Sequence, residues 1–352
     1  MPLNLLKELI STPSTSRAED ATASIIESWL QSRGVETTRY DNNILAYSDG
    51  FDPAKRPTLL MNSHHDTVKP SASYTRDPFA PTVEGDTLYG LGSNDAGSSV
   101  VGLMNAFVHH RSTPLNINLL LAITAEEEVM GEGGIRSLTE QLKCVDMALV
   151  GEPTGMNAAI GERGLVVLDC VAHGRSGHAA RDEGENALYK AVDDIAKLRS
   201  YQFEKKSSLL GDIRMTTTMI ECGTQHNVVP DKCKYVVDIR TTDAYTNEET
   251  VEILRGVVEA EIAPRSTRIK ASALSEEHPL LRAAVELGAE PYVSPTTSDM
   301  ALMSYPSLKM GIGESSRSHT ADEFVLVSEL ERGVELYKEY IQKLSSYYET
   351  LE

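Results

Sequence analysis

Histidine and acidic residues recur in this 352-residue sequence with the types and spacing of a metal site. His64 and Asp66 follow an apolar run and stand two residues apart, and in an extended segment such side chains point to the same side. The carboxylate can therefore brace a metal-binding imidazole or share its site. A lone His-x-Asp is also common as an ordinary polar pair. Whether this one belongs to a metal site therefore depends on the other candidate residues.

Four further segments carry side chains of the same kinds. Asp95 lies in the glycine-rich turn YGLGSNDAGSS, where it could equally be a helix N-cap. Glu126-Glu127-Glu128 follow an apolar run and repel one another unless cations or protons intervene, although a solvated helix N-terminus would also suit them. Glu152 in GEPT could be a loop carboxylate, and His319 in SRSHTADEF a surface histidine.

Taken together, these residues favour a hydrolytic site for zinc or a similar divalent ion. The ligands would be two imidazoles and three carboxylates, with no thiolate. Two divalent ions bring four positive charges and Asp95, Glu128 and Glu152 bring three negative ones, so one hydroxide completes the balance. Adjacent glutamates face differently, so one can bind metal while its neighbour handles protons.

The elements that must position these residues have an α/β pattern. A helix is predicted at 18–33, and apolar, strand-like runs at 58–61, 117–124, 147–150 and 307–312 each lead into the candidate residues. Continuous apolar strands alternating with helices indicate a mainly parallel sheet covered on both faces. Ligands bind at the carboxyl ends of such strands, where these candidates collect.

The middle of the chain has a different order of predicted elements, the β-α-β-β-α-β order of a ferredoxin-like unit. Its predicted elements are a strand at 164–173, a helix at 186–198, strands at 214–221 and 233–240, a helix at 248–260 and a strand at 269–273. We therefore predict a catalytic domain of residues 1–162 and 275–352, interrupted by an α+β domain at 163–274.

Composition narrows the class of partner. The chain has 33 Lys and Arg against 52 Asp and Glu, a net charge of −19, which argues against nucleic acid and anionic membranes. No apolar run approaches the ~20 residues that span a bilayer, and Lys7 and Glu8 interrupt the N-terminal one, so no signal peptide is expected.

The cysteines carry no C-x-x-C spacing, and we expect buried free thiols in a cytoplasmic protein. They are Cys144, Cys170, Cys222 and Cys233.

The order of motifs resembles a known family, the zinc-dependent amidohydrolases and exopeptidases that include acetylornithine deacetylase, succinyl-diaminopimelate desuccinylase, aminoacylase and carboxypeptidase G. The motifs are SHHDTV, YGLGSNDAGSS, TAEEEVMGEGG, GEPT, GRSGHAA, NVVPD, DIR, TSDM and GIGESSRSHTADE. They run nearly end to end, and the whole is most similar to the acetylornithine deacetylases.

This resemblance implies a zinc-exopeptidase-like catalytic domain interrupted by a lid and dimerisation domain. It implies two zinc ions per subunit, with cobalt or manganese as substitutes. His64 would bind one zinc and His319 the other, Asp95 would bridge them, and Glu128 and Glu152 would complete the ligand set.

The resemblance also implies roles for residues that bind no metal. Asp66 would orient His64, and Glu127 would be the general base. His178 would reach the site of the other subunit in a homodimer and stabilise an oxyanion. The positions that resemble substrate-binding ones are Asn227, Arg240 and Thr297. A guanidinium fork suits a substrate carboxylate.

The expected reaction is hydrolysis of the amide bond of an N-acyl-amino acid, with N-acetylornithine of arginine biosynthesis as the first candidate. Alternatives are N-succinylornithine, N-acetylcitrulline, another acyl-amino acid, or exopeptidase action on di- and tripeptides. A metal-binding protein without catalysis could share the fold. Glu127 beside an intact ligand set argues against that class, since such a protein needs no base.

Overall fold

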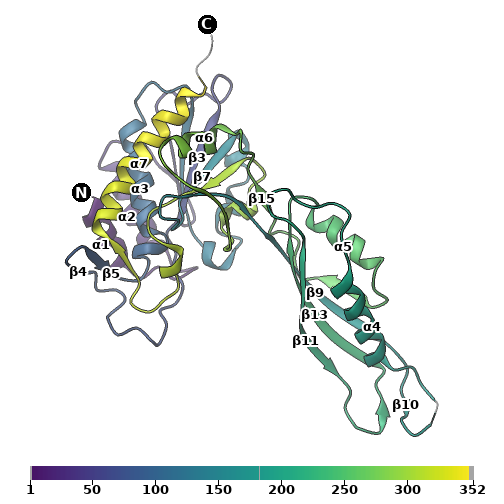
Figure 1. The fold of residues 1–352 in the computed structure, drawn as a ribbon. Helices are drawn as coiled ribbons and strands as arrows, with labels where there is room; N and C mark the ends of the chain where they lie inside the picture. The colour runs from purple at the N-terminus through teal and green to yellow at the C-terminus, as the bar shows by residue number, and fades with distance from the viewer. Residues whose placement is uncertain (1, 182, 349–352) are drawn as a thin grey trace. The chain divides into compact units, whose positions relative to one another are not determined.

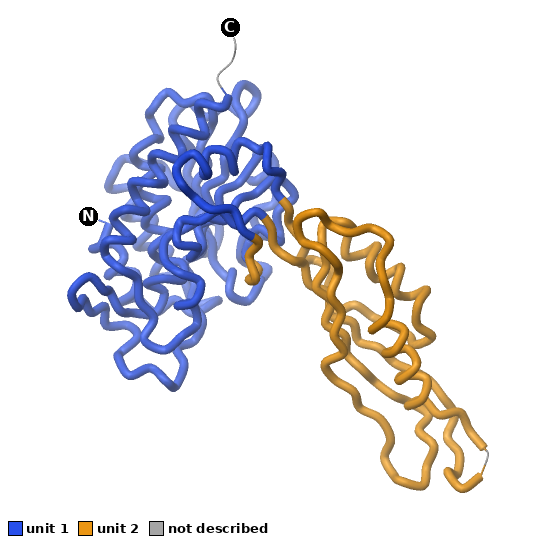
Figure 2. The backbone as a smooth tube through the Cα atoms, in the orientation of Figure 1, with its two compact units in different colours: residues 1–160, 274–292, 298–352 blue, residues 161–273, 293–297 orange. Residues whose placement is uncertain are grey.

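The computed structural model describes residues 2–181 and 183–348, and the chain divides into two compact units (Figure 2). Unit 1 comprises residues 1–160, 274–292 and 298–352, and unit 2 comprises residues 161–273 and 293–297. The predicted insertion, 163–274, differs from the main segment of unit 2 by one or two residues at each end. Residues 293–297, which we had placed in the catalytic domain, group with unit 2 because their contacts lie mainly there.

Unit 1 is built on a mixed sheet with the strand order β1-β2-β6-β3-β7-β17-β8, of which Figure 1 labels β3 and β7. Its strands are β1 (Thr38–Tyr40), β2 (Asn43–Tyr47), β3 (Thr58–His64), β6 (Asn118–Thr124), β7 (Met147–Val150), β8 (Ala158–Glu162) and β17 (Ser307–Lys309), and β16 (Pro291–Ser294) pairs with β8. The central strands β6, β3, β7 and β17 are parallel, whereas β2 and β8 flank them antiparallel. The predicted α/β class with a parallel core is confirmed.

A small antiparallel sheet accompanies the large one in unit 1. Its order is β18-β5-β4, with β4 (Thr82–Glu84), β5 (Thr87–Tyr89) and β18 (Phe324–Leu326).

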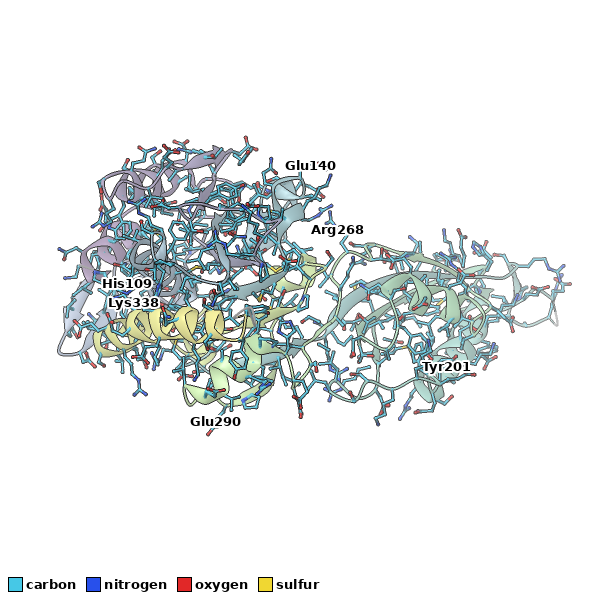
Figure 3. The ribbon with its side chains drawn as sticks, turned by 90° about the horizontal axis from the view of Figure 1, so that it is seen from above. His109, Glu140, Tyr201, Arg268, Glu290 and Lys338 are labelled. Atoms are coloured by element: carbon cyan, nitrogen blue, oxygen red, sulfur yellow. The ribbon has the colours of Figure 1, made fainter. Side chains whose placement is uncertain are left out.

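Helices and short 3-10 turns cover both faces of the large sheet, which explains the unbroken apolar runs. The helices are α1 (Pro2–Ile10), α2 (Asp20–Gln31), α3 (Ser98–His110), α6 (Pro279–Glu286) and α7 (Val327–Ser346). Helix α3 packs against β3 and against α7, and His109 and Lys338 mark that helix pair in Figure 3. Three short turns pack against β6 and β7 in one buried apolar cluster. These turns are Ile135–Leu138, Gln141–Cys144 and Asp299–Leu302. Every residue of β3 and β6 is buried.

The parallel register brings the ends of three strands to one edge. His64 pairs with Thr124 of β6, and Asn62 pairs with Val150 of β7. The chain therefore leaves β3, β6 and β7 at the same edge of the sheet, and the residues that follow them become neighbours.

Unit 2 is a four-stranded antiparallel sheet with the order β11-β13-β9-β14 and two helices. Its elements are β9 (Gly164–His173), β10 (Gly177–His178), α4 (Ala187–Ser200), β11 (Arg214–Cys222), β12 (Val228–Val229), β13 (Lys232–Thr241), α5 (Asn247–Arg255), β14 (Glu261–Pro264) and β15 (Ser272–Ala273). This strand order is the ferredoxin-like arrangement that we predicted.

The end of the β-α-β-β-α-β pattern was predicted wrongly. The second helix ends at Arg255 rather than 260, and the fourth strand is β14 at Glu261–Pro264. Of the segment 269–273, Ile269 forms an isolated bridge with Leu165 and β15 pairs with the end of β8. Both β14 and β15 follow the second helix as short strands, and the sequence pattern alone does not show which of them joins the sheet of unit 2.

All four cysteines are free thiols, but their burial is mixed. Cys170 and Cys233 are buried as predicted, whereas Cys144 and Cys222 are half-buried. Among the described residues, no helix is long and apolar enough to cross a membrane.

Candidate metal centre

The candidate metal residues of unit 1 converge at the shared edge of its sheet. His64 is the last residue of β3, Glu127 and Glu128 lie in a 3-10 turn after β6, and Glu152 follows β7. Asp95 comes from the segment before α3. His319 comes from the segment between β17 and β18. The structure thus brings together all five residues predicted as metal ligands, and Glu127 with them.

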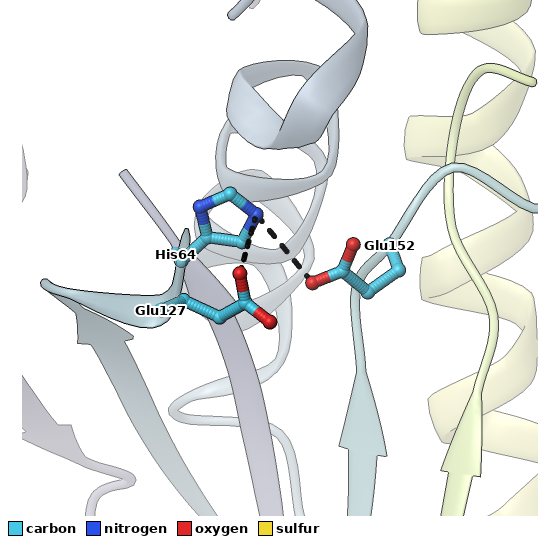
Figure 4. A group of neighbouring side chains, drawn as sticks. All are labelled: His64, Glu127 and Glu152. Atoms are coloured by element: carbon cyan, nitrogen blue, oxygen red, sulfur yellow. Dashed lines mark ion pairs between the residues drawn. The ribbon is translucent and has the colours of Figure 1, made fainter. Parts of the chain in front are cut away.

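His64 lies at the centre of one half of the cluster (Figure 4). Its Nε2 is 3.5 Å from Oε1 of Glu152 and 3.9 Å from Oε2 of Glu127, the two ion pairs drawn in the figure. The same Nε2 is 3.2 Å from Oδ1 of Asp95. Its Nδ1 is 3.0 Å from the carbonyl oxygen of Asp66, which can only accept a hydrogen bond. Nδ1 therefore carries a proton, and Nε2 is the atom directed at the carboxylates.

Asp95 connects this half to a second one around His319. Its Oδ1 faces His64, while its Oδ2 is 3.7 Å from Nε2 of His319. The same Nε2 is 2.9 Å from Oε2 of Glu128. One carboxylate thus directs one oxygen to each imidazole, as a carboxylate does when it bridges two cations.

Asp66 fixes the positions of His64 and of the turn that carries Glu127 and Glu128. Its carboxylate is fully buried and lies 3.4 Å from Nδ1 of His64. It also accepts hydrogen bonds from the backbone N–H groups of Glu127, at 3.0 Å, and Glu128, at 3.2 Å, and from Ser16 Oγ at 2.7 Å. The residue predicted to orient His64 therefore also fixes the turn that presents both glutamates.

The three consecutive glutamates have different surroundings. Glu126 adopts a left-handed conformation with φ 53°, and its carboxylate accepts from the Gly133 N–H at 3.4 Å and pairs with Arg17 at 3.6 Å. It packs so closely on Gly131 and Gly133 that a Cβ on either glycine would overlap it. Glu126 thus supports the loop, while Glu127 and Glu128 join the cluster.

Two buried acids that our sequence analysis did not single out complete the surroundings. Glu323 accepts hydrogen bonds from the backbone N–H groups of Gly92, at 3.2 Å, and of Asn94 and Asp95, each at 2.9 Å. Asp299 accepts from Thr124 Oγ1 at 3.0 Å. Both residues stand in motifs quoted above, ADE and TSDM, but nothing in an acidic run shows which carboxylate turns inward.

His65 is buried beside His64 but faces another way. Its Nδ1 is 2.9 Å from Thr22 Oγ1, and its Nε2 is 2.9 Å from the carbonyl oxygen of Asn42. Burial lowers its pKa to about 4, so the ring is neutral at pH 7. Both ring nitrogens are engaged, so His65 has no free nitrogen to offer to the cluster.

The electrostatics of the cluster show an excess of buried negative charge. Burial raises the pKa of Glu152 to about 8, with a contribution from Asp95, although His64 and Lys309 oppose the shift. Burial, with the nearby Glu152 and Asp299, also raises the pKa of Glu127 well above its usual range. These carboxyls would therefore hold protons at pH 7 unless a further cation neutralises them.

Divalent cations fit this donor set. One group of donor atoms within 4.8 Å of one another comes from His64, Glu127 and Glu152, and another from His64, Asp95 and Glu128. Imidazole and carboxylate donors suit zinc and similar ions, and a bound cation would lower the pKa values that burial raises.

The residues predicted to bind substrate or an oxyanion all belong to unit 2. His178 lies on β10, where its Nδ1 accepts from the Ala180 N–H at 3.1 Å, and the Asn227 carbonyl accepts from the Ala179 N–H at 3.0 Å. Arg240 lies on β13 and Thr297 in the segment 293–297. They are not members of the unit 1 cluster.

The guanidinium of Arg240 already has a carboxylate partner. Its Nε and Nη2 donate to the two carboxylate oxygens of Asp238, at 2.8 and 3.2 Å. A substrate carboxylate could still bind to the other edge of the guanidinium, through the N–H groups of Nη1 and Nη2 that Asp238 does not use.

Two imidazoles and several buried carboxylates gathered at one edge of a sheet form a donor set that suits a metallohydrolase. Residues 60–343 match the model of Peptidase family M20/M25/M40, and the chain belongs to this family. It is accordingly a metal-dependent hydrolase of amide bonds. The succinyl-diaminopimelate desuccinylase of Dinoroseobacter shibae is 30% identical in an alignment 365 positions long that covers 94% of this chain and 95% of the relative.

Solved structures share the fold across nearly the whole chain. The aminopeptidase PepT of Bacillus cereus superposes with a TM-score of 0.77 at 18% identity, over 97% of this chain and 98% of its own. The YXEP protein of Bacillus subtilis, described as a dinuclear metal binding peptidase, gives a TM-score of 0.73 at 19% identity, over 99% and 98%.

Glu323 should affect metal binding without touching a metal. In Glu323→Gln, the side chain keeps one acceptor oxygen, and an NH₂ group takes the place of the other. That NH₂ group would face a backbone N–H, so the Asp95 segment should lose its fixed position. We expect zinc affinity to fall about 10- to 100-fold, measured by competition with a chromophoric chelator.

The matched control for this variant is Asp322→Asn. Asp322 is the neighbouring carboxylate, but it accepts from Thr75 and Arg76 instead. Equal zinc affinities for the wild type and Glu323→Gln would contradict the positioning role of Glu323.

Proposed function

We propose that the protein hydrolyses the amide bond of an N-acyl-amino acid, with two divalent ions, taken to be zinc, held around Asp95. The observation that carries this proposal is the placement of Asp95 between His64 and His319. Glu152 then belongs to the His64 side and Glu128 to the His319 side.

The side chains divide the chemistry between them. The metal pair, when bound, supplies an electrophile for the amide carbonyl and acidifies a water molecule. Glu127 takes the proton from the attacking water and passes it to the leaving nitrogen, which departs as an amine. Asp66 fixes the Glu127 backbone through a 3.0 Å hydrogen bond, so this proton carrier stays beside His64.

The proposed substrate is an N-acyl derivative of a diamino acid. The motifs resemble those of acetylornithine deacetylases, while the curated relatives that the chain matches are named succinyl-diaminopimelate desuccinylase. N-acetylornithine and N-succinyl-diaminopimelate both have a scissile amide, a free amine and a carboxylate. The net charge of −19 is compatible with a cationic amino-acid product.

A substrate panel tests this proposal directly. Amine release from zinc-loaded protein would be measured with N-acetylornithine, N-succinyl-diaminopimelate, N-succinylornithine, N-acetylcitrulline, N-acetylmethionine and several dipeptides. We expect an acyl-diamino acid to be hydrolysed well above the others, and a chelator to abolish the reaction until zinc is restored. Preference for a dipeptide, or activity that survives the chelator and metal removal, would contradict the proposal.

The general-base assignment predicts a specific kinetic defect. Glu127→Gln should retain bound metal but lose about 10²- to 10⁴-fold in kcat, because the amide cannot carry the proton. Glu126→Gln is the matched control, since Glu126 faces the Gly131–Gly133 loop and should keep a near-normal rate. Near-normal turnover by Glu127→Gln would remove Glu127 from this role.

We further propose that the protein is a homodimer formed through unit 2. Large apolar side chains are exposed there on one helix and on an edge strand, namely Tyr189 and Val192 of α4 and Met219 and Ile220 of β11. Exposed apolar residues beside an unpaired strand edge are typical of an interface. In such a dimer His178 of one subunit would complete the site of the other.

Subunit mixing tests this shared site. Neither His178→Ala nor Glu127→Gln should be active alone, because one lacks the oxyanion donor and the other the base. After verified subunit exchange, a mixed dimer contains one site with both wild-type residues, so up to about half of the activity per heterodimer should return. Exchange without any regain would contradict a shared site.

A further inference from the structure

Two cysteines of unit 2 face each other across neighbouring strands. Cys222 of β11 and Cys233 of β13 are register partners in an antiparallel pair. The neighbouring Cys222 side chain contributes to the raised pKa of the Cys233 thiol, and the Cys222 Sγ donates to the carbonyl oxygen of Lys232 at 3.4 Å. Neither residue belongs to the metal centre or to the proposed substrate contacts.

The hydrogen-bond pattern of β13 shows which kind of pair this is. The Gly174 N–H donates to the carbonyl of Asp231 at 2.8 Å, so residue 231 directs its backbone groups towards β9. Backbone groups alternate along a strand, and the register with β9 continues without a break, so Cys233 also faces β9, opposite Ala172. Cys222 and Cys233 are therefore a non-hydrogen-bonded pair.

That geometry suits a covalent bond between the two sulfurs. In non-hydrogen-bonded antiparallel pairs the Cα atoms are about 4.5 Å apart and the side chains are at their closest. A disulfide spans Cα separations of about 4.4–6.8 Å. The separation typical of such a pair therefore lies inside the range that a disulfide spans, near its lower end.

The two thiols differ in access. Cys233 is fully buried, whereas Cys222 is half-buried and lines a pocket of about 220 Å³ together with Lys232 and Lys234. A small disulfide can reach Cys222 first. Burial raises the pKa of the Cys233 thiol to about 12, which also leaves Cys222 as the first nucleophile.

We propose that Cys222 and Cys233 are a reversible modification site, oxidised to an intrachain disulfide by low-molecular-weight disulfides such as oxidised glutathione. The Cys222 thiolate attacks one sulfur of the small disulfide, forms a mixed disulfide and releases one small thiolate. The Cys233 thiolate then attacks the Cys222 sulfur and releases the second. Two cysteine thiols are oxidised, one small disulfide is reduced to two thiols, and the cysteine protons end on those thiols.

The bond would close the segment that joins β11 to β13. This segment carries Asn227 and strand β12, which pairs with β10 at Gly177 and His178. The Ala187 N–H also donates to the Pro230 carbonyl within it. A disulfide at its base restricts the unfolded chain and holds this part of unit 2 together.

The test uses the reduced full-length protein equilibrated in glutathione buffers of increasing oxidised fraction. After the remaining thiols are blocked, tryptic peptides are analysed by mass spectrometry without reduction. We expect two of the four thiols to be lost and residues 215–232 to be linked to residues 233–234. Dithiothreitol should reverse the link, and the oxidised protein should unfold at a higher temperature than the reduced one.

Two variants make the result specific. Cys222→Ser should form no linked peptide and show no oxidation-dependent shift in unfolding temperature. Cys144→Ser, which removes a similarly half-buried thiol, should still form the link. No thiol loss, a glutathione adduct on Cys222 that never resolves, or a Cys222 link between two chains would each overturn the proposal.

Discussion

The carboxylate of Asp95, placed between two imidazoles, is the interaction on which the rest of the site depends. One oxygen lies 3.2 Å from His64 and the other 3.7 Å from His319, so the two halves of the centre share one anion. Asp95 is buried, and the acid that fixes its segment, Glu323, is buried too. Burying so many carboxylates is unfavourable unless cations accompany them, which makes metal binding part of how this region is held together.

The backbone conformation places the side chains of neighbouring residues in different surroundings. Parallel pairing of β3, β6 and β7 brings their carboxyl ends to one edge, and Asp66 then fixes the turn after β6 by accepting two backbone hydrogen bonds. Because of that turn, Glu126 supports the glycine loop while Glu127 and Glu128 reach the cluster. A single run of three identical residues thus supplies one group that supports a loop and two that join the cluster, for which we propose the roles of proton carrier and ligand.

Much of this could be predicted from the sequence, because apolar runs ending in His, Asp and Glu report both a buried strand and its carboxyl end. Glu323 and Asp299 could not be picked out, since their importance lies in hydrogen bonds to segments far along the chain. The last strand of unit 2 was misplaced because two short apolar runs follow α5. The facing of Cys222 and Cys233 also depended on a register that spacing alone does not reveal.

The most direct test of the account is anomalous diffraction from crystals of the zinc-loaded protein. We predict two zinc peaks per chain, one on each side of Asp95, with His64 and Glu152 at one and His319 and Glu128 at the other. Glu127 and His65 should bind neither ion. A single peak, or Glu127 in place of Asp95 as the shared ligand, would contradict the central claim.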